Sequence, residues 1–92
     1  MESHLTDSNP NDLPVTFTSF VVSLAGSAMM HLGEAPHPGT GKTQTDLTLA
    51  KSTIDLLTLL RHKTKGNLEE DEQVLLNTLL DELNGKLTHL SA

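Results

Sequence analysis

The stretch PHPGTGKT at positions 36–43 contains the residue types that bind nucleotide phosphates. A phosphate-binding loop follows the pattern G-x-x-x-x-G-K-[ST], in which backbone N–H groups surround the phosphates and the Lys and hydroxyl complete the site. Gly41, Lys42 and Thr43 fit this pattern, but Pro36 occupies the place of the first Gly. Proline has a fixed φ and no N–H, so it cannot make that turn. The preceding segment reads as a helix instead of the required strand, and we therefore predict an exposed interhelical loop that does not hydrolyse ATP.

Two other sets of polar residues have spacings that could support chemistry. His31, Glu34 and His37 form H-x-x-E-x-x-H, which suggests a metal site, but the second half is a Pro-rich loop in which helical spacing cannot bring the three side chains together. Lys51 and Asp55 are four residues apart in a predicted helix, the spacing of an ordinary ion pair. A catalytic role for them would need an enclosed pocket. We predict no catalytic residue, no metal, no cofactor and no enzymatic activity.

Length and composition limit how such a chain can be stabilised. The 92 residues form one domain, and a single core of this size contributes only about 3–5 kcal/mol. Cysteine is absent, so no disulfide adds to it. Residues 1–14 (MESHLTDSNPNDLP) are polar and acidic and are predicted to be a disordered tail, with a single helical domain at 15–90. We expect this domain to complete its core by homo-oligomerisation.

Charge and hydropathy exclude some classes of partner. The net charge of −6 and the presence of only two aromatic residues, Phe17 and Phe20, argue against nucleic-acid binding. Residues 15–32 carry no formal charge, but their Thr, Ser, Gly and His content makes them a poor match for a membrane span. No basic region precedes an apolar run at the N-terminus, so we predict a cytoplasmic protein.

Hydrophobic periodicity and capping residues predict an all-α fold of three helices at about 16–32, 46–65 and 69–83 or longer. Thr45 or Asp46 can cap the second helix, and Gly66 can terminate it in a left-handed conformation. The turn before the third helix is basic, but the acidic run EEDE at 69–72 would repel an anion there. Asn84 and Gly85 could end the third helix, although its leucine stripe continues to Leu90.

The faces of the first two helices indicate self-association. Helix 16–32 has no charged stripe to turn to water, and its small residues would allow another helix to approach closely, within the chain or from another subunit. Helix 46–65 has two apolar clusters, which need two partners: helix 16–32, and either the third helix or another chain. The predicted oligomer interface comprises Phe17, Ser19, Phe20, Ser23, Gly26, Ser27, Met30, Leu49, Leu56 and Leu60.

Three motifs resemble the bacterial family known as domain of unknown function 1844. They are F-x-x-F-x-x-S-L at 17–24, A-K-x-x-I-D-L-L at 50–57 and K-T-K-G-N-L at 63–68, within a resemblance that covers about 15–83. The family often has Thr after the last motif as a helix cap, where this chain has Glu69. The resemblance implies a small, mostly helical cytoplasmic protein and transfers no activity.

These observations favour a non-enzymatic, self-associating helical module that acts through protein contacts. We predict a homodimer or homotrimer, and leave open a second protein as a further partner. The alternative is a small-ligand or metal-binding protein whose site lies at a subunit junction, with His31, Glu34, Lys51 and Asp55 as its polar groups. A third hypothesis is peripheral membrane association through helix 16–32.

Overall fold

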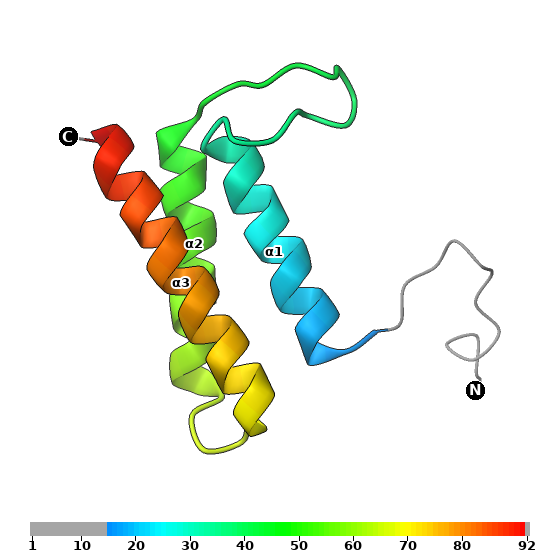
Figure 1. Ribbon diagram of the computed structural model, residues 1–92, viewed down its shortest axis with the longest axis vertical. Coiled ribbons are helices and arrows are strands. Elements are labelled where there is room, and N and C mark those ends of the chain that lie inside the picture. The colour runs from blue at the N-terminus through cyan, green and yellow to red at the C-terminus, as the bar shows by residue number, and fades with distance from the viewer. Residues whose placement is uncertain (1–14, 92) are drawn as a thin grey trace, which may run out of the picture.

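Three helices follow one another along the chain: α1 (Phe17–His31), α2 (Leu47–Lys63) and α3 (Glu70–Ser91). The computed structural model describes residues 15–91, so the predicted disordered tail at 1–14 lies outside the described residues. Successive helices run in opposite directions, and α2 packs against both others (Figure 1). Residues 15–91 contain no strand, only one isolated antiparallel bridge between Leu32 and Thr45. The prediction of a small all-α, three-helix fold is confirmed.

The start of α1 is fixed by a reciprocal pair of hydrogen bonds. Thr16 Oγ1 accepts the N–H of Ser19, and Ser19 Oγ accepts the N–H of Thr16, both at 3.0 Å. This capping box satisfies two N–H groups that the helix itself cannot pair. Ser19, which the sequence assigned to an interface patch, therefore has a structural role at this end of α1.

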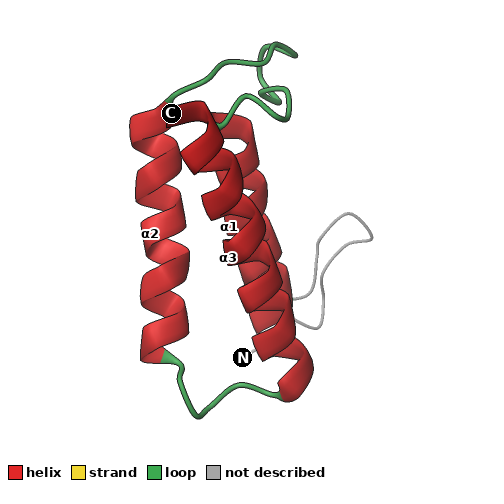
Figure 2. Ribbon diagram, turned by 60° about the vertical axis from the view of Figure 1, so that its left-hand side comes forward, coloured by secondary structure: helices red, strands yellow, loops and turns green. Residues whose placement is uncertain are grey.

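The loop between α1 and α2 is pinned at its base. The Asp46 N–H donates to the His31 carbonyl at 2.7 Å, next to the Leu32–Thr45 bridge. Asp46 is also the predicted cap of α2, because its Oδ1 accepts the Leu49 N–H at 3.0 Å. Figure 2 shows this loop projecting from one end of the helices, with the shorter α2–α3 turn at the other end.

At the opposite end of α2, the chain reverses through Gly66. This residue has φ +87°, the left-handed conformation predicted for it, which glycine adopts without steric cost. The helix itself ends at Lys63, before the predicted limit of 65. Glu69 precedes α3, and Glu72 Oε1 accepts its N–H at 2.9 Å, which is one half of a capping box.

Helix α3 continues through Asn84 and Gly85 to Ser91. An interior glycine costs a helix roughly 0.5–1 kcal/mol relative to alanine. Burial of Leu80 and Leu83 before Gly85, and partial burial of Leu87 after it, outweighs that cost. The helix therefore does not end at Asn84 or Gly85 but continues along the leucine stripe.

The core lies along the line where the three helices meet. Its members are apolar side chains with little or no exposure: Val21, Ala25, Ala28, Leu32, Ala50, Ile54, Leu57, Leu76, Leu80 and Leu83. The alanines of α1 and α2 allow these helices to approach closely. The second apolar cluster of α2 stays largely outside, since Leu49, Leu56 and Leu59 each retain about half of their exposure. Leu60, the fourth member of this cluster, packs against the core, so α1 and α3 cover the cluster only in part.

Among residues 15–91, no helix is both long enough and apolar enough to span a membrane.

Candidate interaction surface

The phosphate-loop look-alike is an exposed turn between two helices, as predicted. It follows α1 rather than a strand, and α2 begins only at Leu47, beyond the Gly-Lys-Thr triplet. The carbonyl of His37 accepts the Gly41 N–H at 2.8 Å, and the Lys42 carbonyl accepts the His37 N–H at the same distance. These bonds close the turn on itself. The backbone N–H groups that would surround a phosphate in a true loop are used in this closure or lie away from a helix start.

Glu34 of the H-x-x-E-x-x-H motif is engaged away from the two histidines. Glu34 Oε1 lies 3.3 Å from Lys86 Nζ on α3, and His37 Nδ1 accepts the Gly39 N–H at 3.0 Å. His31 lies at the end of α1, and it lines the same hollow as His37, together with Met30, Gln44, Asp46 and Leu49. Within residues 15–91, no three His, Cys, Asp or Glu side chains are grouped so as to hold a metal ion.

Lys51 and Asp55 form the ion pair that their spacing predicted, with Nζ and Oδ2 2.9 Å apart. Their side chains are 67% and 62% exposed, so water screens the interaction and it contributes little to stability. The pair lies on the side of α2 turned to α3, away from His31. The four polar residues of the alternative hypothesis therefore do not converge within one chain.

The side of α2 that faces α3 can be identified from the clefts between the two helices. Lys51 and Asp55 line one cleft with Leu87, and Thr58 and Arg61 line a second with residues of α3. The opposite stripe of α2, at the helical spacing i, i+4, i+7, i+11, consists of Leu49, Thr53, Leu56 and Leu60.

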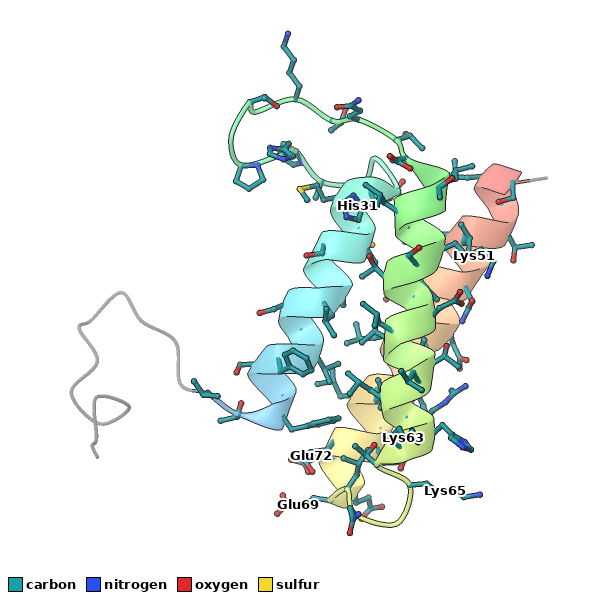
Figure 3. The ribbon with its side chains drawn as sticks, turned by 180° about the vertical axis from the view of Figure 1, so that it is seen from behind. His31, Lys51, Lys63, Lys65, Glu69 and Glu72 are labelled. Carbon is teal, nitrogen blue, oxygen red and sulfur yellow. The ribbon has the colours of Figure 1, made fainter. Side chains whose placement is uncertain are left out.

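A matching stripe with the same spacing runs along α1 and consists of Phe20, Leu24, Ser27 and His31. Its C-terminal end meets the α2 stripe at the hollow shared by His31 and Leu49. Together the two stripes form one surface, which we call the α1–α2 face: Phe20, Leu24, Ser27, His31, Leu49, Thr53, Leu56 and Leu60. In Figure 3, α1 and α2 lie in front of α3, and His31 is on the side turned to the viewer.

The α1–α2 face is mainly apolar, carries no formal charge and is only half covered, and Asp46 lines the hollow at its His31 end. Phe20 and Leu56 are each 50% exposed and Leu49 is 48% exposed. Thr53 is buried and its hydroxyl donates to the Leu49 carbonyl at 2.9 Å, so it presents no unpaired polar group. The face contains no Asp, Glu, Lys or Arg. Contiguous apolar surface of this kind is typical of sites where another protein or a membrane binds.

The structure places the ten predicted interface residues in several different environments. Phe20, Ser27, Leu49, Leu56 and Leu60 lie on the α1–α2 face, Phe17 packs at the margin of the core, and Met30 lines the hollow beside Leu49. Ser23 and Gly26 are exposed on other sides of α1, and Ser19 is in the capping box. The predicted interface omitted Leu24, His31 and Thr53. Leu24 and His31 are four and eleven residues from Phe20, and Thr53 is seven residues from Leu60, so these spacings could have identified them.

Comparison with known proteins gives one match. A family model described as Domain of unknown function (DUF1844) matches residues 14–89, a range that includes α1, α2 and most of α3. It agrees with the resemblance carried by the three sequence motifs. No curated protein and no solved structure matches the chain.

Proposed function

Because the chain belongs to the family described as Domain of unknown function (DUF1844), whose description names no activity, we propose a function from its geometry: a non-enzymatic helical module that self-associates through the α1–α2 face. In this proposal, two copies pack face to face, and the resulting dimer acts through protein contacts.

The observation that carries the proposal is the exposure of large apolar side chains on this face. Phe20, Leu49 and Leu56 keep about half of their surface in water, although three helices are available to cover them. Burying apolar surface is worth about 25 cal/mol per Å². A partner that covers this face therefore supplies stabilisation that the small core of a single chain lacks.

Charge favours a second copy as that partner. The chain has a net charge of −6, and α3 carries five of its carboxylates, at Glu70, Asp71, Glu72, Asp81 and Glu82. Two acidic molecules repel each other least when they approach through surfaces without charge. The α1–α2 face is such a surface, and because both copies offer the same one, the contact is isologous and closes as a dimer.

The size of the face indicates a weak dimer. The 17 residues of α2 give a length of about 25 Å, and two helices side by side are about 20 Å wide, so the face covers roughly 500 Å². A standard interface buries about 800 Å² per partner. We therefore expect dissociation in the micromolar range, with a monomer at high dilution.

A non-enzymatic role is supported by the placement of the polar side chains. The Lys51–Asp55 pair is exposed to water, and Glu34 is engaged by Lys86. A catalytic constellation needs groups held together in a site that excludes water, whereas both of these ion pairs are open to water.

Sedimentation equilibrium of the full chain, from micromolar to millimolar concentration, tests the proposal. We expect a monomer–dimer equilibrium, and methyl NMR resonances of Leu49 and Leu56 that shift on dilution while those of Leu90, 40% exposed on α3, stay unchanged. A monomer at all concentrations would refute self-association. A trimer, or dilution shifts centred on Leu90, would refute the proposed face.

A further inference from the structure

A second surface of the molecule, between α2 and α3, gathers hydrogen-bond donors. An open hollow of about 480 Å³ is lined by Thr58, Arg61, His62, Lys65, Gln73 and Asn77. The α2 residues Thr58, Arg61 and His62 have the spacing i, i+3, i+4, so they lie on the same side of the helix. Lys65 follows in the turn after α2 ends at Lys63. Two cations, a histidine, a hydroxyl and two amides therefore line one concave surface, with no carboxylate among them.

Hydrogen bonds across the hollow orient the amide of Asn77. Its Oδ1 accepts from Arg61 Nη1 and from Gln73 Nε2, each at 3.4 Å. Because the oxygen is turned to these two donors, the Nδ2 group of Asn77 remains available to donate to a ligand. Arg61 is half-buried, which restricts its guanidinium and lowers the entropy lost when it binds.

The acidic residues nearby form no ion pair with these cations. Glu72 Oε1 accepts the Glu69 N–H, and Asp71 Oδ1 accepts the Glu72 N–H, both at 2.9 Å, so this part of the acidic run serves the start of α3. Figure 3 shows Lys65 pointing away from Glu69 and Glu72. Glu70 and Asp81 lie on α3 beyond either end of the Gln73–Asn77 pair, and neither lines the hollow. Within residues 15–91, neither Arg61 nor Lys65 forms an ion pair with a carboxylate.

We propose that this hollow binds a phosphate group. A guanidinium presents several N–H donors in a plane that matches two oxygens of a phosphate, and Lys65 adds a second positive charge. The Asn77 and Gln73 amides can donate to the remaining oxygens, whereas the Thr58 hydroxyl already donates to the Ile54 carbonyl at 3.2 Å. The site lies between α2 and α3, on the opposite side of α2 from the α1–α2 face, so it does not depend on self-association.

Titration of the full chain with inorganic phosphate, followed by NMR of Arg, Asn and Gln side-chain N–H resonances at constant ionic strength, tests the site. We expect saturable shifts centred on Arg61, Gln73 and Asn77. Arg61→Gln should weaken binding about tenfold, the effect of losing one charge-assisted hydrogen bond. Lys51→Gln removes the same charge from an exposed pair elsewhere on α2, and should leave binding unchanged.

Asn77→Asp provides a second test that does not disturb the fold. An aspartate oxygen can accept from Arg61 and Gln73 as the amide oxygen does, but it adds a negative charge to the hollow and removes the amide donor, so phosphate binding should be lost. Shifts that rise linearly without saturation, or equal weakening in Arg61→Gln and Lys51→Gln, would overturn the proposal. Saturation by acetate with the same affinity would overturn the assignment to phosphate.

Discussion

Replacing Phe20 by Glu should dissociate the proposed dimer while leaving the monomer folded. Phe20 and Val22 are both 50% exposed and are two residues apart on α1. Two residues rotate a helix by about 200°, so the side chains point in nearly opposite directions. Val22 is outside the α1–α2 face, and Val22→Glu is therefore a control with the same new charge and the same exposed fraction on the same helix.

The magnitude follows from the exposed half of Phe20. Complete burial of a large apolar side chain is worth about 2 kcal/mol, so covering the remaining half is worth about 1 kcal/mol per copy. A symmetric dimer contains this contact twice, which gives about 2 kcal/mol per dimer. At 1.4 kcal/mol per factor of ten, loss of the contact alone raises the dissociation constant about 30-fold. Two carboxylates brought into an uncharged interface raise it further.

Sedimentation equilibrium of wild type, Phe20→Glu and Val22→Glu measures this difference, and circular dichroism confirms that all three retain their helices. We expect Phe20→Glu to be monomeric where wild type and Val22→Glu are dimeric. If both variants weaken the dimer equally, the effect comes from added charge in general, and the argument for the α1–α2 face fails.

Four further substitutions follow from backbone geometry. Glu69→Thr should complete the capping box with Glu72 and raise the free energy of unfolding by roughly 0.5–1 kcal/mol in urea denaturation; no gain would mean that residue 69 is not the cap of α3. Gly85→Ala should stabilise α3 by roughly 0.5–1 kcal/mol, because its new Cβ meets nothing within 4 Å. Gly66→Ala should destabilise the protein by about 1 kcal/mol or more, because residue 66 has φ +87°. In thermal unfolding, the midpoint temperatures of these two variants should therefore shift in opposite directions. Gly26→Ala should likewise stabilise α1 in thermal unfolding and leave the dimer mass unchanged, while a weakened dimer would place the interface on the small-residue side of α1.

The sequence predicted the helix ends best where one residue determines the backbone locally. Asp46 caps α2 and Gly66 reverses the chain because each acts within one turn of its own position. The end of α3 was harder to predict, since Gly85 opposes a helix locally while distant contacts of Leu83 and Leu87 favour it. A cap residue or a turn glycine can be recognised from the local sequence, whereas the contacts of Leu83 and Leu87 depend on tertiary packing.

The same distinction between local and long-range information explains why the sequence predicted the α1–α2 face only in part. The sequence identified two apolar clusters on α2 and predicted a partner for each, but periodicity cannot show where α3 packs. In the structure α1 and α3 share the cluster centred on Ile54 and Leu57, which leaves Leu49 and Leu56 exposed. The ion pair between Glu34 and Lys86 joins residues 52 positions apart and has no signal in the sequence.

The pinned base of the α1–α2 loop has a consequence for protein engineering. The Leu32–Thr45 bridge and the bond from the Asp46 N–H to the His31 carbonyl hold both ends of the loop together, independently of the residues between them. Doubling the length of a flexible loop costs only about 0.6 kcal/mol in closure entropy. The exposed segment around Gly39 is therefore a suitable insertion point for an epitope tag or a fluorescent reporter, which would label the molecule at the end of the helices without altering the core.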